Sequence, residues 1–124
     1  MIFEVSDQTS VSNRPPFVQT LDASHNSLTS VPKNFLDFLA PAIRALDLSF
    51  NRISEVESAS FSLLGVLQTL SLNNNNIMDM EKSSLRHMAS LQIIDLSWNR
   101  IEVLQFAQMA GLTNLRFVSI AHNR

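Results

Sequence analysis

The chain has 124 residues, of which 45% are hydrophobic and 16% are charged, so it holds enough apolar material for a continuous core and is not expected to be disordered. Its formal charge is −2, and its nine basic residues are scattered. This distribution excludes a basic stripe that would neutralise a run of phosphates or hold an anionic membrane, so we expect no nucleic-acid partner.

Markers of several other protein classes are also missing. The absence of cysteine excludes disulfides, thiolate zinc sites and cysteine nucleophiles, and it leaves the redox compartment open. The first residues include Glu4 and Asp7 where a signal peptide would need an apolar run, and stretches such as FSLLGVL are too short to span a bilayer. No N-x-S/T sequon occurs. We therefore expect no membrane insertion of this segment.

Residues 1–17 differ in pattern from the rest of the chain. The stretch IFEV has the composition of a short strand, and SDQTSVSNRPP after it is a polar loop marked by two prolines. An internal repeat then begins, with copies that start at Val18, Ile43, Leu67, Leu91 and Leu115. These copies are called the first to fifth repeats below.

The repeats share one motif. They read VQTLDASHNSL, IRALDLSFNRI, LQTLSLNNNNI, LQIIDLSWNRI and LRFVSIAHN, which is L-x-x-L-x-L-x-x-N-x-L with conservative replacements. The asparagine of the motif recurs at intervals of 25, 24, 24 and 24 residues, at Asn26, Asn51, Asn75, Asn99 and Asn123. Within the run of four asparagines at 73–76, the period selects Asn75 as the structural one.

This motif resembles that of the leucine-rich repeat family, in the 24-residue form typical of extracellular animal proteins such as Toll-like receptors and small leucine-rich proteoglycans. The resemblance covers residues 18–124 and implies an α/β solenoid. In that fold a right-handed coil carries a parallel β-sheet on its concave face and short turns, 3₁₀ or helical segments on its convex face. Residues 1–17 then resemble an N-terminal cap without the cysteine cluster that extracellular relatives usually carry.

The leucine and asparagine positions of the motif each have a physical reason. Leucines in the L-x-L segment alternate as in a short strand with one buried face, and successive copies are expected to stack as a parallel sheet. Where the chain turns inward after the strand, a buried backbone group without a partner would cost about 1–3 kcal/mol. The carboxamide of asparagine donates and accepts at once, so we expect it to bond backbone in its own and the neighbouring repeat.

The return half of each repeat fills the same interior positions, as with Ile53, Val56, Phe61, Leu64 and Leu67 after the second asparagine. SASFSLLG and EKSSLRHMA are expected to form short turns on the convex side. The first repeat has one extra residue, which predicts a small bulge near Pro41.

The sequence ends directly after the fifth asparagine, at SIAHNR. A solenoid must cover the open ends of its core, so we expect a fifth repeat that is incomplete and a chain that is a fragment of a longer array. The alternative is that a final strand is enough. The uncapped edge also offers a surface for self-association.

Non-consensus positions of the strands are expected to line the concave face in columns. The candidate ligand-binding residues in these columns are Arg44, Asp47, Phe50, Asn74, Ile93, Asp95, Trp98 and Phe117. The serine column, which is Ser24, Ser49, Asn73, Ser97 and Ala121, is likewise expected at the surface.

Two of these assignments have alternatives. Large apolar groups on a solvent-facing sheet are typical anchors of a protein interface, but Phe50 and Trp98 can instead fold over the strand edge and shield the neighbouring repeat. The aspartates at 22, 47 and 95 form an acidic row for a basic partner, or they are simply what the family commonly has in LDLS.

Catalysis is not expected. His25 and His122 share a column but lie four repeats apart, about 19 Å at ~4.8 Å per strand, so they cannot share a metal or a proton. Asp22, Ser24 and His25 are close in sequence, yet an open sheet provides no cleft for a serine triad. No P-loop, G-x-G-x-x-G or H-E-x-x-H motif occurs. No catalytic residue, metal site or cofactor is therefore predicted.

Three functions fit these features. The first is a non-enzymatic protein-interaction module, for which the resemblance implies a receptor or matrix ectodomain, extracellular or on the cell surface, that recognises a protein or microbial ligand. The second is a structural array segment, or an intracellular scaffold repeat, without a ligand of its own. The third is a decoy that stacks on another repeat array. The sequence leaves a cytoplasmic location open as well.

Overall fold

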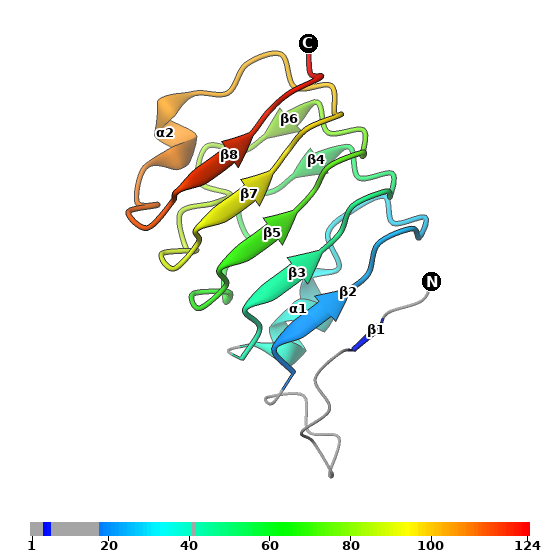
Figure 1. Cartoon of the computed structure of the whole chain (residues 1–124), viewed down its shortest axis with the longest axis vertical. Helices are drawn as coiled ribbons and strands as arrows, with labels where there is room; N and C mark the ends of the chain where they lie inside the picture. Colours follow the sequence, from blue (N-terminus) through cyan, green and yellow to red (C-terminus); the bar gives the residue numbers. More distant parts are fainter. Residues whose placement is uncertain (1–3, 6–17, 41) are drawn as a thin grey trace.

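The computed structural model describes residues 4–5, 18–40 and 42–124. Its main feature is a six-stranded sheet of order β1-β2-β3-β5-β7-β8, formed by short strands that follow one another along the solenoid (Figure 1). The five strands from the repeats are parallel: β2 (Thr20–Asp22), β3 (Ala45–Asp47), β5 (Thr69–Ser71), β7 (Ile93–Asp95) and β8 (Phe117–Ser119). The predicted fold class is confirmed.

β1 (Glu4–Val5) covers the first repeat's edge of this sheet. It lies within the predicted strand IFEV and pairs antiparallel with β2, with Val5 opposite Leu21. The loop predicted at 6–16 lies outside the described residues, and the assignment of residues 1–17 as a cap stays a prediction.

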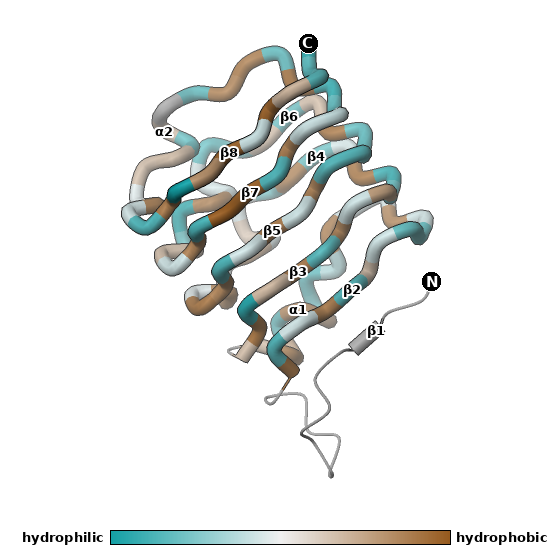
Figure 2. Tube along the Cα trace, viewed as in Figure 1, coloured by the Kyte–Doolittle hydropathy of each residue, from teal (hydrophilic) through white to brown (hydrophobic). Residues whose placement is uncertain are grey.

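The core follows from the register of the parallel strands. Leu21, Leu46, Leu70, Ile94 and Val118 are opposite one another from strand to strand, and the first four are at most 1% exposed. One step later, the next inward positions of these four repeats are fully buried as well. Hydrophobic residues therefore recur at matching places in successive coils (Figure 2). The period-two pattern of the sequence becomes one continuous stack of apolar layers.

The return segments close the core on the side opposite to the main sheet (Figure 1). β4 (Glu55–Val56) and β6 (Asp79–Met80) form a parallel pair there, and Val56 and Met80 face the core. Residues 58–63 and 82–87 are turns, as predicted, and Phe61 in the first is fully buried.

Two return segments contain a helix. α1 (Lys33–Leu39) lies in the first repeat, which has the extra residue, and buries Leu36 and Leu39. α2 (Phe106–Met109) is a single turn in the fourth repeat. Seven helical residues fit into the longer first repeat, whereas the 24-residue repeats have room for turns only or for one helical turn. The bulge predicted near Pro41 falls on a residue outside the described ranges.

The asparagines tie neighbouring repeats together. Asn75 Nδ2 donates to the backbone oxygens of Leu48 and Leu72, at 3.0 Å each, and Asn75 Oδ1 accepts the N–H of Ile53 at 3.0 Å. Asn51, Asn99 and Asn123 bridge their neighbours in the same way, and Asn26 donates to Ala23 and Ser24. Each of these side chains therefore bonds the turn of its own repeat, and four of them also bond the preceding repeat.

A second local motif shapes the end of the strands. In the first, second and fourth repeats, the Oδ1 atom of the aspartate accepts both the N–H and the hydroxyl of the serine two residues later. The pairs are Asp22–Ser24, Asp47–Ser49 and Asp95–Ser97. This bonding to the following turn gives these three aspartates a structural role that needs no ligand.

Replacing Asn75 by alanine should lower the free energy of unfolding by about 3 kcal/mol, because the buried N–H of Ile53 loses its acceptor while two carbonyls each lose one of two carboxamide donors. Urea unfolding measures the change. Asn76→Ala is the matched control, since its side chain is exposed, and it should change the value by less than about 0.5 kcal/mol. Equal losses in both variants would contradict the role of Asn75.

The Ser24 hydroxyl, followed by the Ser24 N–H, lowers the pKa of Asp22 below its ordinary value of 3.8, with a smaller contribution from His25 and against partial burial. Since the folded pKa lies below the unfolded one, this stabilisation is present above pH 3.8 and is lost as the pH falls through the folded pKa. Ser24→Ala should raise the pKa of Asp22 toward 3.8 in an NMR titration of its carboxyl carbon. Ser27→Ala, on an exposed side chain, should leave it unchanged.

Candidate functional site

The open side of the main sheet, here called the sheet face, carries side chains in rows fixed by the strand register. One row is Thr20, Ala45, Thr69, Ile93 and Phe117, and a second is Asp22, Asp47, Ser71, Asp95 and Ser119. Parallel pairing sets adjacent members of a row about 4.8 Å apart. The sheet face is therefore a regular surface whose chemistry changes only with the side chains.

The first row becomes apolar toward the fifth repeat. Ile93 and Phe117 are direct register partners in β7 and β8, and they are 41% and 57% exposed. Neither side chain belongs to the buried core. Exposing two large apolar side chains next to each other on a solvent-facing sheet costs free energy, because their apolar surface is in contact with water.

Charges on the sheet face are of both signs. Arg44 and Arg116 are exposed and precede β3 and β8. The carboxylates of Asp47 and Asp95 each use one oxygen for the serine that follows, as described above. This bonding supports the structural reading of the acidic row, while the other oxygen of each carboxylate has no hydrogen bond within the described part of the chain.

The expectation of a surface serine column is wrong for two of its members. Ser49 and Ser97 are only 5% and 8% exposed, because their hydroxyls turn back to Asp47 and Asp95. Their side chains belong to the turn after the strand. They are not available to a ligand.

A separate line of side chains follows the rim where the strands end. This rim column consists of His25, Phe50, Asn74, Trp98 and His122, each directly before a ladder asparagine. All five residues have positive φ angles, between 54° and 58°. That left-handed conformation turns the side chains out of the coil at the same angle in every repeat.

Ring contacts within the rim column show the shielding alternative for Phe50 and Trp98, while a role in binding stays a prediction. Phe50 stacks on His25 at 4.4 Å between ring centroids, and Trp98 stacks on His122 at 3.9 Å. Each ring thus covers its neighbour in an adjacent repeat, the first for Phe50 and the fifth for Trp98, yet Phe50 stays 45% and Trp98 55% exposed. The rings of Phe50 and Trp98 therefore shield a histidine of the adjacent repeat and remain partly exposed to solvent.

The candidate residues fall into two groups. Ile93 and Phe117 lie on the sheet face, which also carries Asp95 in the strand of Ile93, and Arg44 and Asp47 in the second repeat. Phe50, Asn74 and Trp98 lie together on the rim. From the sequence, all eight candidate residues were expected on one concave surface. The structure divides them, because the residues with positive φ angles lie on the rim and the others lie on the sheet face.

Among the described residues, the histidines and carboxylates near these two groups do not form a metal-binding cluster. His25 and His122 lie in the first and fifth repeats, at opposite ends of the rim column. Among the described residues, no cluster of three or more histidine, aspartate or glutamate side chains is placed to hold a metal ion. In the same part of the chain, no helix has the length and hydropathy needed to cross a bilayer.

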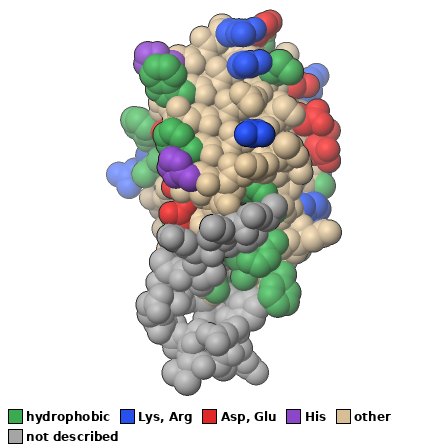
Figure 3. Space-filling model, turned by 90° about the vertical axis from the view of Figure 1, so that its right-hand side faces the viewer, with side chains coloured by type: hydrophobic (Ala, Val, Ile, Leu, Met, Phe, Trp, Pro, Cys, Tyr) green, Lys and Arg blue, Asp and Glu red, His purple; other side chains and the backbone are tan. Residues whose placement is uncertain are grey.

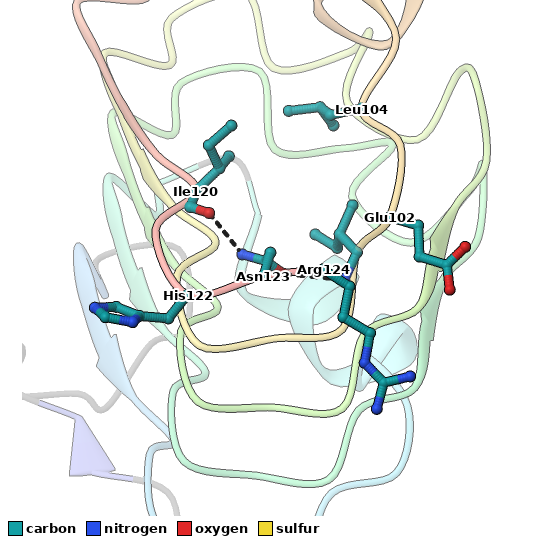
Figure 4. Close-up of a pocket in the computed structure, with 7 residues that line it drawn as sticks. Glu102, Leu104, Ile120, His122, Asn123 and Arg124 are labelled. Carbon is teal, nitrogen blue, oxygen red and sulfur yellow. Dashed lines mark hydrogen bonds between the residues drawn. The ribbon is translucent and has the colours of Figure 1, made fainter.

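The end of the solenoid at β8 is a surface that the candidate residues did not include. Val118 and Ile120 are 37% and 50% exposed, although the matching positions of the four preceding repeats are at most 1% exposed. Ile120 also lines a cavity of about 260 Å³, and Ile120 and Leu104 project into the space at this end of the solenoid (Figure 4). This surface could have been found in the sequence, because Val118 and Ile120 occupy the inward-pointing leucine positions of the motif in the fifth repeat.

Comparison with known proteins agrees with this architecture. The family described as leucine rich repeat matches residues 16–77, 41–101 and 65–124. The structure is similar to a chain of the Drosophila Toll–Spätzle complex, with a TM-score of 0.79 and 19% identity over 86% of this chain and 14% of that one. For the glycosylated form of that complex the TM-score is 0.76, at 20% identity over 85% of this chain and 15% of that one.

A third solved structure, the TLR13–ssRNA13 complex, has a TM-score of 0.65 and 28% identity over 86% of this chain and 18% of that one. The chain thus spans less than a fifth of the length of each of these relatives. No curated protein sequence matches it. Because the three family matches together extend from residue 16 to residue 124, over a solenoid of the same fold, the chain belongs to the leucine-rich repeat family.

Proposed function

We propose that the chain is a non-enzymatic protein-interaction module that binds a protein ligand through the sheet face. The observation that carries the proposal is the exposed pair of Ile93 and Phe117 in adjacent strands. Large apolar side chains at the centre of an interface supply much of its binding energy, and the rigid register holds them in place before the partner arrives. The polar part of the interface, which selects the partner, then comes from three charged residues of the same sheet face: Arg44, Asp47 and Asp95.

The relatives support an extracellular or cell-surface setting. Toll is in a complex with Spätzle in the solved structure, and TLR13 is in a complex with single-stranded RNA. For this chain a protein ligand fits better than RNA, because the sheet face mixes arginines with aspartates and the formal charge is −2. We propose that the chain acts as part of a receptor or matrix-type ectodomain.

A second candidate function rests on the end of the solenoid at β8. Leu96 and Trp98 donate their N–H groups to the fifth repeat, but the corresponding N–H groups of Ile120 and His122 have no acceptor within the described part of the chain. A further coil with the same pattern would supply acceptors and bury Val118 and Ile120. The chain would then serve as an array segment, or it would stack on another repeat array.

Exchanging Ile93 and Phe117 together for glutamate should weaken binding of a captured protein ligand by about 30-fold or more, because two exposed apolar anchors are lost. Immobilised chain is used to capture ligands from extracellular fluid, and the affinity of each purified ligand is then measured by calorimetry. Val103→Glu is the matched control, since Val103 is 67% exposed but lies on a return segment. Ligands that bind wild type and double variant equally would place the binding surface elsewhere.

Stacking through the β8 end predicts self-association that depends on concentration. Analytical ultracentrifugation should show dimers of the wild-type chain at high concentration and only monomers of Ile120→Asp, because a buried, unpaired carboxylate opposes the contact. Met78→Asp, on a 57% exposed side chain of a return segment, should still dimerise. A wild-type chain that stays monomeric throughout would count against self-stacking.

A further inference from the structure

The rim column contains four rings and one interruption. His25 and Phe50 stack with an interplanar angle of 10°, and Trp98 and His122 stack with an angle of 15°. Between these two pairs, the third repeat has Asn74, with the same backbone conformation. Figure 3 shows two places on this side of the molecule where a hydrophobic side chain lies against a histidine, separated along the solenoid.

The interruption has the width of one inserted ring. Phe50 and Trp98 are two repeats apart, which is about 10 Å at ~4.8 Å per strand. Backbone bonds from Phe50 N–H to Asn73 and from Asn74 N–H to Ser97, of 3.1 and 3.0 Å, hold this part of the rim at strand spacing. A planar group midway would lie about 5 Å from each ring, within the ~4.5–7 Å range of aromatic pairs.

Both walls of this slot have an uncovered side. Phe50 and Trp98 each have one ring face against a histidine, and the near-parallel stacking directs the opposite face toward the third repeat. Phe50 and Trp98 stay 45% and 55% exposed, and the Asn74 side chain between them is shorter than either ring, so it is too small to cover both faces completely. An inserted ring would remove apolar area from water on two sides at once.

Charge selects what can enter. The second repeat has Asp47 and Arg52 on either side of Phe50 in sequence, and the fourth has Asp95 and Arg100 on either side of Trp98. The corresponding positions of the third repeat are Ser71 and Asn76, so the repeat under the slot is uncharged from residue 71 to residue 76. Its carboxamides donate and accept hydrogen bonds. At these two positions each flanking repeat has one negative and one positive charge, so neither sign dominates beside the slot, which favours an uncharged planar group.

We propose that the slot between Phe50 and Trp98, with Asn74 at its base, accepts one uncharged aromatic side chain of a protein partner. The inserted ring completes a column of five rings along the rim, and the Asn74 carboxamide bonds a polar atom at its edge. The proposal rests on the proposed function in one respect, which is that the partner is a protein. It concerns the rim, whereas the proposed function concerns Ile93 and Phe117 on the sheet face.

The test uses small probes for the side chain. The probes are p-cresol for tyrosine, methylguanidinium for arginine and adenosine for a nucleobase. Upfield shifts of the p-cresol ring protons in NMR, and a change in the emission of Trp98, which is the only tryptophan of the chain, report insertion. We expect p-cresol to bind and methylguanidinium to bind at least tenfold more weakly. Absence of p-cresol binding overturns the proposal, and so does preferential binding of methylguanidinium or adenosine.

Matched variants locate the probe. Asn74→Phe fills the slot from within, in a conformation that Phe50 and Trp98 already adopt, and should abolish p-cresol binding. Asn76→Phe, two residues away and exposed, should leave it intact. Phe50→Leu removes one wall and should weaken binding by about two- to tenfold, whereas Phe38→Leu, on an exposed ring of α1, should not. Retained binding in both Asn74→Phe and Phe50→Leu overturns the proposal.

The two proposals fail separately. The double change of Ile93 and Phe117 to glutamate should abolish capture of a protein ligand and leave p-cresol binding in the slot unchanged, because the sheet face and the rim are different surfaces. A slot that rejects p-cresol while ligand capture still depends on Ile93 and Phe117 overturns the inference about the rim alone. The proposed function of the sheet face would then stand.

Discussion

The whole arrangement depends on buried carboxamides that satisfy backbone groups of two repeats at once. Asn51, Asn75 and Asn99 are 7–8% exposed, and each accepts an N–H from the preceding repeat while donating to carbonyls of both repeats. Leu48 and Leu72 oxygens each accept from two successive asparagines. The bonds therefore form a chain from coil to coil, and losing one carboxamide disturbs two neighbours. Such coupling makes stability a property of adjacent repeats.

The same turn creates the rim. The residue before each asparagine takes a positive φ so that the asparagine can point inward, and for phenylalanine or tryptophan this conformation costs about 1–2 kcal/mol. The ladder bonds hold the conformation against that cost. Ring stacking between Phe50 and His25, and between Trp98 and His122, returns part of it. A requirement of the backbone thus fixes where the aromatic side chains are displayed.

The sequence was most informative where period and burial coincide. Alternating leucines and the spacing of the asparagines predicted the strands, the inward residues and the bridging contacts, since these depend on stacking that every repeat must satisfy. It failed for Ser49 and Ser97, because the direction of a hydroxyl depends on a local acceptor, here an aspartate two residues earlier. It also left Phe50 and Trp98 undecided, since period alone gives neither φ nor the contact with a histidine one repeat away.

Binding surfaces on such a solenoid are more easily built on the sheet and its rim than on the return side. Strand pairing and ladder bonds repeat without change along the sheet, so a substitution there alters chemistry and leaves position fixed. The return segments vary from α1 to plain turns and differ in length, so equivalent residues have no common spacing. A partner that contacts several repeats needs groups at constant intervals, which preorganises the contact and lowers the entropy lost on binding. Ile93 and Phe117 on the sheet, and Phe50 and Trp98 on the rim, occupy positions of this kind.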